Sequence, residues 1–232
     1  EVATALISAR ATVDVANNDG RTPLLAAAQN GHHEVVAALI AADATGDQAP
    51  SDGRTPPPGA AENGHHEIVT ALIAAGATVD LADNDGATPL HHAVSGGHHV
   101  VVAALIAARA NVDLARNDGA TPLLIAAEIG HLDVVAALIA ARATVDLANN
   151  DGFTPLFVAA SGGHHEVVAA LIAARAPVDL AMDDGCTPLL AAAQHGHHEI
   201  VAALIAARAT VDQANNNGWT PLLCAADNGH HE

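Results

Sequence analysis

Histidine is the residue type in this sequence that most suggests chemistry, because imidazole nitrogens bind metal ions and exchange protons near neutral pH. The chain has 232 residues and sixteen histidines. Twelve of them form Gly-His-His pairs, at His32/His33, His65/His66, His98/His99, His164/His165, His197/His198 and His230/His231. Adjacent residues on a helix do not face each other. Equivalent residues on neighbouring helices, about 8–10 Å apart, cannot share one zinc ion at about 2.0–2.1 Å. The pairs therefore predict no metal site and no cofactor.

One denser set of histidines stays open as the alternative metal site: His91, His92, His98 and His99. The aspartates also recur, after Val and before Gly, but calcium needs six to eight converging oxygens. We interpret the aspartates as turn residues on a solvated edge.

Catalysis finds no support in the residue pattern. The sequence has no G-x-S-x-G element and no glycine-rich phosphate loop. Cys186 falls in a turn and Cys224 in a helix, so we expect no disulfide between them and no catalytic thiol. The sequence predicts a protein that is not an enzyme.

The charge balance excludes two classes of partner. Eight basic residues oppose 26 acidic ones, for a formal net charge of −18. Nucleic acid and anionic membrane surfaces both require basic patches, and the longest apolar run, 100–108, is too short to span a bilayer. Two cysteines fit a reducing compartment, which favours an intracellular, cytoplasmic location.

A fixed period organises the whole chain. Thr-Pro-Leu or a variant of it begins at Thr22, Thr55, Thr88, Thr121, Thr154, Thr187 and Thr220, always 33 residues apart. In the typical unit 118–150, Thr121 is the expected N-cap of a short helix that Gly130 ends. A second short helix follows, with Asp133 in its first turn and Arg142 at its end.

Helices of two or three turns are marginal alone, so each unit must stack on its neighbours in an all-α solenoid. The pattern D-G-x-T-P-L followed by G-H-x-E-V-V resembles the ankyrin repeat. The resemblance implies an ankyrin-repeat α-solenoid of helix-turn-helix units with protruding β-turn tips. We divide the single array 1–232 into a partial repeat 1–18, full repeats 19–51, 52–84, 85–117, 118–150, 151–183 and 184–216, and a partial repeat 217–232.

Two departures from the ankyrin pattern carry expectations. The loop after the second helix usually has Gly, but only Gly76 provides it, and Arg or Asp stands in the other repeats. A left-handed residue other than Gly costs about 1–2 kcal/mol. Residues 46–59 also lose several repeat positions to Pro and Gly, which predicts a weak segment, either a hinge or a decayed repeat.

Partner-binding residues are expected where the repeats differ from one another, because constant positions stack the array. The turn tip and the end of the first helix vary most, and the resemblance makes them part of a concave binding face. The candidates are Arg21, Arg54, Ile129, Phe153, Cys186, His195 and Trp219. Phe153 and Trp219 are possible hot spots, although they could instead fold onto neighbouring turns. Phe157 is expected to pack between repeats.

We therefore predict a protein-interaction scaffold that binds a protein or peptide with a basic patch along the concave face. The alternative is a sensing or targeting segment of a larger enzyme or channel. A purely structural or engineered repeat protein is disfavoured by the irregular 46–59 segment. Uncapped terminal repeats could also associate end to end.

Overall fold

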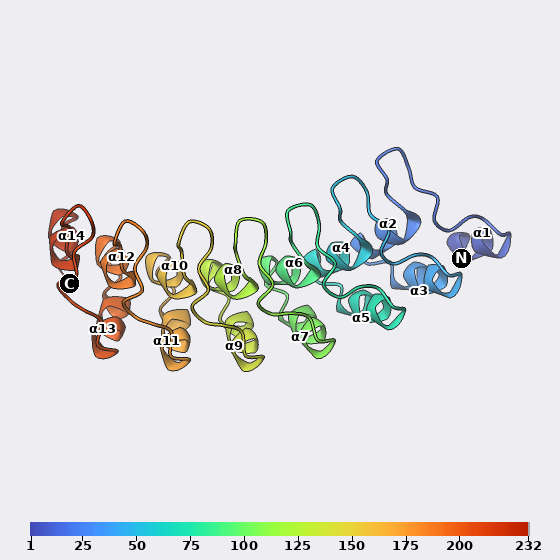
Figure 1. The fold of residues 1–232 in the computed structure, drawn as a ribbon. Helices are drawn as coiled ribbons and strands as arrows, with labels where there is room; N and C mark the ends of the chain where they lie inside the picture. The colour runs from blue at the N-terminus through green and yellow to red at the C-terminus, as the bar shows by residue number, and fades with distance from the viewer. Residues whose placement is uncertain (232) are drawn as a thin grey trace. The chain divides into compact units, whose positions relative to one another are not determined.

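The computed structural model describes residues 1–231, which contain fourteen α-helices and no strand (Figure 1). The first helices of the repeats are α2 (Pro23–Gln29), α4 (Pro56–Glu62), α6 (Pro89–Ser95), α8 (Pro122–Ile129), α10 (Pro155–Ser161), α12 (Pro188–Gln194) and α14 (Pro221–Asp227). The second helices are α1 (Val2–Ser8), α3 (His33–Ala41), α5 (His66–Ala74), α7 (His99–Ala107), α9 (Leu132–Ala140), α11 (His165–Ala173) and α13 (His198–Ala206). The predicted all-α fold is confirmed.

The helices belong to two compact units, residues 1–117 and 118–232. Their boundary coincides with the end of one predicted repeat. In the first unit α2, α4 and α6 stack in one layer, and α1, α3, α5 and α7 stack in another. In the second unit α8, α10, α12 and α14 form one layer, and α9, α11 and α13 the other. Long turns precede the first helices and project from their layer (Figure 1).

Each first helix has a threonine at its N-cap position, as expected. The Thr121 hydroxyl accepts a hydrogen bond from the N–H of Leu124 at 3.2 Å, and Pro122 is the first helical residue, where its missing N–H is harmless. Gly130 ends this helix in a left-handed conformation, with φ 82°. The threonine cap and the glycine stop predicted for this first helix are confirmed.

The segment predicted to be weak still contains a helix. In α4 the residues Pro56 to Ala61 are all buried, and the helix spans seven residues like most of its counterparts. Pro56, Pro57 and Pro58 occupy the first turn, where a helix needs no N–H donor for its own backbone ladder. The fold tolerates the prolines; the stability of this segment stays a prediction.

The loop after each second helix has the left-handed backbone that the ankyrin pattern implies. Gly76 has φ 94°, and Arg142 takes the same role with φ 67°. The other non-Gly residues with positive φ are Arg10, Asp43, Arg109, Arg175 and Arg208. The left-handed geometry is thus kept without glycine, at the conformational cost expected from the sequence.

The core of each unit is built from small aliphatic side chains. Leu123 and Ala126 of α8, and Val135 and Leu138 of α9, are fully buried. Alanine lets these short helices approach closely, so the layers pack with almost no aromatic side chain between them.

Neighbouring repeats are also joined by hydrogen bonds from the loops. The Asp179 carboxylate accepts the N–H of Thr210 at 2.9 Å and its hydroxyl at 2.7 Å. The Nε2–H of His197 donates to the carbonyl oxygen of Ser161, 36 residues earlier, at 3.1 Å. His65, His98, His164 and His230 make the corresponding bond. The first histidine of the Gly-His-His pair is therefore a structural link between repeats.

Candidate partner-binding surface

The candidate surface, called the tip surface below, consists of the seven turn-tip residues and the residues at the ends of the first helices. The tip residues are Arg21, Arg54, Ala87, Ala120, Phe153, Cys186 and Trp219. Each unit contributes its own part of this surface.

A side-chain oxygen holds the backbone of every tip. In four repeats this oxygen belongs to the residue four positions before the tip, as where Asn149 Oδ1 accepts the N–H of Phe153 at 2.9 Å. Asn17, Asp83 and Asn215 act in the same way. The other three repeats have Pro50, Arg116 and Met182 at that position.

In those three repeats the aspartate before the Gly replaces the missing acceptor. The carboxylates of Asp52, Asp118 and Asp184 accept the N–H of the tip residue at 3.0, 3.0 and 2.9 Å. Either device satisfies the tip N–H locally, a common role of Asn and Asp in turns. The tip backbone is thus independent of the tip side chain, which leaves that side chain free to vary.

In the first unit the two candidate arginines differ. Arg21 is exposed and makes no ion pair among the described residues. The Arg54 guanidinium lies 3.0 Å from the carboxylate of Glu62 and 3.8 Å from that of Asp83. The buried Asp83 carboxylate also pairs with the Nε2 of His92 at 3.0 Å. The charge of Arg54 is therefore balanced by acidic side chains within the fold.

In the second unit Phe153 lies against Phe157, with ring centroids 5.5 Å apart and planes tilted by 49°. Phe157 is only 7% exposed, which confirms that it packs inside the array. Phe153 remains half-buried at the turn tip. Part of the Phe153 side chain thus contacts the protein, and the remainder is accessible.

The two thiols are held in their protonated forms. Burial, with smaller contributions from Asp184 and Cys224, raises the pKa of Cys186 to about 11. Burial also raises the pKa of Cys224, and Asp227 adds to the effect. Both cysteines are free, as expected. Cys186 is a half-buried neutral side chain rather than a nucleophile.

The remaining candidates occupy different environments. Trp219 is 36% exposed and Ile129 is 42% exposed, so both offer apolar surface. His195 Nδ1 bonds to the carbonyl oxygen of Ala191 at 2.9 Å, and its ring stacks on His197. His195 therefore caps its own helix as well as lying at the surface.

The structure does not assemble the alternative metal site. His91 Nδ1 lies 3.1 Å from the nitrogen of Thr88, His92 pairs with Asp83, and His98 Nε2 bonds to the carbonyl oxygen of Glu62 at 3.0 Å. His99 is exposed at the start of α7. No group of three or more possible protein ligands converges anywhere in residues 1–231. The proposed cluster is corrected to three histidines with separate hydrogen-bonding roles and one solvent-facing residue.

Sequence reasoning missed the acidic neighbours of the tips. Asp83 is the one acid in a column otherwise filled by Asn, Pro, Arg and Met, which was a usable signal. Glu62 is the last residue of α4 and Glu128 is the last but one of α8, and no sequence signal shows that Glu62 pairs with the tip of its own repeat.

A family model of ankyrin repeats (three copies) matches residues 1–83, 42–115, 59–148, 102–180, 126–214 and 174–232. The chain belongs to the ankyrin repeat family. The crystal structure of the ankyrin repeat domain of Bcl-3, described as a unique member of the IkappaB protein family, is 25% identical, with a TM-score of 0.80. That likeness covers 90% of this chain and 95% of the other. The human ASB11 ankyrin repeat domain is 28% identical over 88% and 92% of the two chains, with a TM-score of 0.78. No curated protein matches the sequence.

Ankyrin repeats generally mediate protein–protein interaction and act as non-enzymatic scaffolds, which agrees with the function class predicted from the sequence. None of the helices in residues 1–231 of this ankyrin chain combines the length and the apolar character needed to cross a bilayer.

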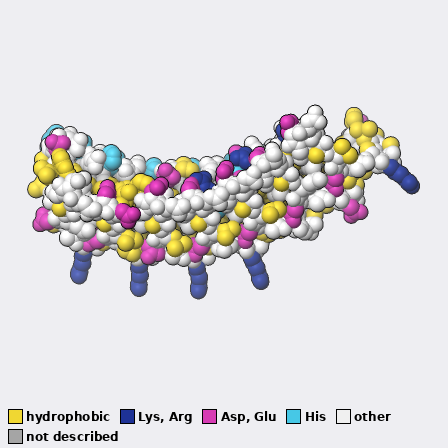
Figure 2. Space-filling view, turned by 45° about the horizontal axis from the view of Figure 1, so that its top comes forward, with side chains coloured by type: hydrophobic (Ala, Val, Ile, Leu, Met, Phe, Trp, Pro, Cys, Tyr) yellow, Lys and Arg dark blue, Asp and Glu magenta, His cyan; other side chains and the backbone are white. Residues whose placement is uncertain are grey.

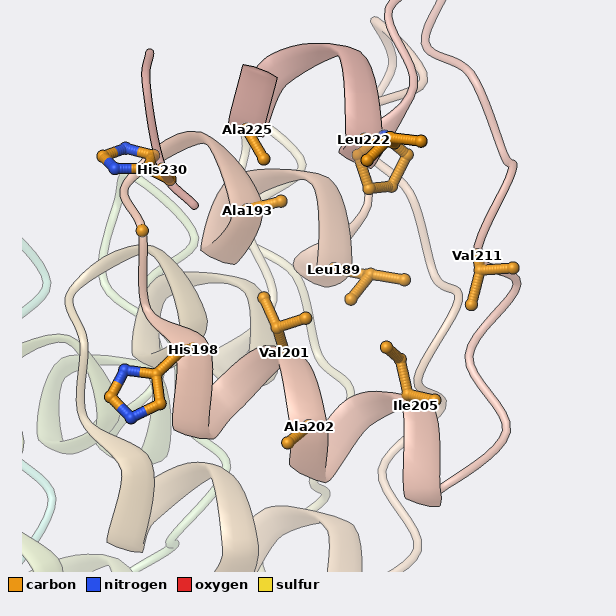
Figure 3. A pocket seen from close by; sticks show the side chains of 12 residues that line it. Leu189, Ala193, His198, Val201, Ala202, Ile205, Val211, Leu222, Ala225 and His230 are labelled. Atoms are coloured by element: carbon orange, nitrogen blue, oxygen red, sulfur yellow. The ribbon is translucent and has the colours of Figure 1, made fainter. Parts of the chain in front are cut away.

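The second unit of this ankyrin chain also carries an apolar groove beside α12, α13 and α14 (Figure 3). The groove has a volume of about 440 Å³ and is lined by residues that include Leu189, Val201, Ile205, Val211 and Leu222. Leu222 is 75% exposed. In the internal repeats, the corresponding face of the second helix is covered by the second helix of the following repeat, as where α13 covers α11.

Proposed function

We propose that this ankyrin repeat chain is an interaction scaffold that binds a protein or peptide with a basic patch along the tip surface. The observation that carries the proposal is the separation of roles at the tips. Asn or Asp oxygens hold all seven tip backbones, while the side chains range from Ala to Arg, Phe, Cys and Trp. A constant backbone with variable side chains is what a recognition surface needs.

The charge of the chain supports a basic partner. The net charge is −18, and the face in Figure 2 shows acidic side chains distributed over both units, with arginine side chains that extend singly. Such a surface steers a basic partner toward it and makes the association salt-sensitive.

Affinity capture tests the proposal. The whole chain and its Phe153→Ala/Trp219→Ala variant are compared as baits, with Leu147→Ala/Leu180→Ala as the control that trims exposed apolar side chains elsewhere in the same unit. We expect the tip variant alone to lose partners, and the captured proteins to dissociate as the salt concentration rises. Identical partner lists from all three baits would rule out a tip-based hot spot.

We also propose that copies of this chain associate end to end, with α1 of one copy in the apolar groove of another. Val2 and Leu6 of α1 are 76% and 57% exposed. A second copy that stacked on α13 and α14 in continuation of the 33-residue period would bring its α1 beside α13. The contact would reproduce the packing of α11 against α13.

A further inference from the structure

A second, more polar pocket opens on the tip surface of the second unit. It has a volume of about 280 Å³ and is lined by Glu128, Phe153, Phe157, Val158, Ser161 and Gly162. It joins the end of one first helix to the tip and first helix of the next repeat, and it is large enough for one long side chain.

The chemistry of this lining is that of a cation site. The faces of Phe153 and Phe157 carry negative quadrupole potential, which attracts a cation within about 6 Å of a ring centroid. Glu128 adds a full negative charge at the same pocket. Its side chain is exposed and has no hydrogen bond or ion pair within residues 1–231.

Glu128 differs in this respect from its counterpart in the first unit. Glu62 occupies the same repeat position, but its carboxylate is paired with Arg54 at 3.0 Å. The tip residue in the repeat of Glu128 is Ala120, which has no charge to offer. The carboxylate of Glu128 is thus available to a ligand.

The backbone around the pocket is already organised. Phe153 donates its N–H to Asn149 Oδ1 at 2.9 Å, and its carbonyl oxygen accepts the N–H of Asn149 at 3.0 Å. The carbonyl oxygens of Glu128 and Ser161 accept hydrogen bonds from the His164 and His197 rings at 2.9 and 3.1 Å. A ligand that enters this pocket therefore pays little to order the protein.

We propose that this pocket binds the guanidinium group of an arginine side chain of the partner. The planar group would stack on the accessible face of Phe153 while its N–H donors reach the Glu128 carboxylate, a combination that suits arginine better than the compact ammonium of lysine. The inference rests on the proposed scaffold function and specifies the basic chemistry that the scaffold recognises.

The pentapeptide acetyl-Gly-Gly-Arg-Gly-Gly-amide is the probe, titrated into the whole chain by NMR. We expect saturable shifts of the Phe153 and Phe157 ring signals. A peptide with citrulline in place of arginine has the same shape without the charge, and we expect its affinity to be at least five-fold lower. Equal binding of both peptides would overturn the proposal.

Matched variants locate the effect. Glu128→Gln and Phe153→Leu are each expected to weaken arginine-peptide binding several-fold; Phe153→Leu keeps an apolar side chain, so the fold is preserved. Asp227→Asn is the control: Asp227 occupies the same repeat position in the same unit, the substitution removes the same charge, and Asp227 does not line this pocket. If Asp227→Asn weakened binding as much as Glu128→Gln, the attraction would be general and the pocket would not be the site.

This outcome is separable from the scaffold proposal. If the arginine peptide fails to bind while partner capture still depends on Phe153 and Trp219, the arginine pocket is wrong and the tip-surface function stands. If partner capture is independent of both aromatics but the arginine peptide binds as described, the tip-based hot spot is wrong and the arginine pocket stands.

Discussion

The buried hydroxyl of Thr55 has no hydrogen-bond partner, because the residue three positions later is Pro58, which has no N–H. In the repeats with a regular cap this N–H comes from a leucine or a phenylalanine, as where Leu190 donates to Thr187 at 3.2 Å. In the Thr88 repeat the capping box also uses the His91 side chain, whose Nδ1 lies 2.8 Å from the Thr88 hydroxyl. Only α4 thus begins with an unsatisfied cap among the first helices in residues 1–231.

Restoring this cap should stabilise the first unit. We expect Pro58→Leu to raise the free energy of unfolding by about 1 kcal/mol, because a cap hydrogen bond is worth about 0.5–2 kcal/mol, partly offset by the greater freedom that the unfolded chain gains without Pro. Urea unfolding followed by circular dichroism measures the change.

A pair of threonine variants provides the control for the cap. Thr55→Val removes a hydroxyl that bonds to nothing and should leave stability unchanged or slightly higher, whereas Thr187→Val should cost about 1 kcal/mol. Equal losses from both variants would show that the hydroxyl of Thr55 is satisfied in solution.

The first helices also show which features of the fold can be predicted from the sequence and which cannot. The 33-residue period, the Thr-Pro start and the Gly stop predict both α8 and α9 correctly, because these signals are local. The same signals predict that 46–59 is irregular. They cannot show that α4 survives, because its burial depends on α2 and α6 packed on either side.

The tip surface was predictable in position but not in electrostatics. Internal comparison of the repeats identifies Phe153 and Arg54 as variable tips. That Phe153 packs against Phe157 with tilted rings, while Arg54 is neutralised by Glu62 and Asp83, depends on side-chain directions. Repeat periodicity contains no information on these directions.

The bond between Asp179 and Thr210 predicts a stability difference between two aspartates of the same repeat position. Asp179→Ala should lower the free energy of unfolding by about 1 kcal/mol, since it removes charge-assisted bonds at 2.9 and 2.7 Å that are partly open to solvent. Asp146→Ala should change little, because the residue opposite it is Pro177, which has neither an N–H nor a hydroxyl. A comparable loss from both variants in thermal unfolding would contradict the role given to the inter-repeat bond.

The raised pKa of Cys186 predicts slow thiol chemistry. A Cys224→Ala background leaves Cys186 as the only thiol and removes only the smallest cause of its raised pKa. A thiol with a pKa of about 11 holds about 100-fold less thiolate at pH 8 than one at 9.0, so alkylation by iodoacetamide should be slower by about that order. Unfolding the chain in urea should restore the ordinary rate. A folded-state rate equal to the unfolded one would contradict the burial of this thiol.

The same shift has a consequence for stability at high pH. The Cys186 thiol of the unfolded chain releases its proton near pH 9.0, whereas that of the folded chain stays protonated until about pH 11. Deprotonation therefore favours the unfolded state, so the stability contributed by the Cys186 thiol is complete below pH 9.0 and is lost as the pH rises toward about 11. Cys186→Ala should remove this part of the decline. Alanine fits the position, since Ala87 and Ala120 occupy it in other repeats.

The apolar groove predicts concentration-dependent association that charge can block at either end. Leu222→Asp places a carboxylate in the groove, and Leu6→Asp places one on α1, so each should raise the apparent dissociation constant at least ten-fold in sedimentation experiments. Leu180→Asp is the control, because it puts the same charge on an exposed leucine outside the groove.

Mixing the two blocked variants distinguishes end-to-end association from any symmetric dimer. The Leu6→Asp chain keeps an intact groove and the Leu222→Asp chain keeps an intact α1, so together they should form a one-to-one pair that neither forms alone. The unmodified chain should instead grow beyond a dimer, because a head-to-tail contact leaves one groove and one α1 unused at the ends of every assembly. A symmetric dimer through the groove predicts the opposite pattern: Leu6→Asp would associate normally, and the mixture would gain nothing.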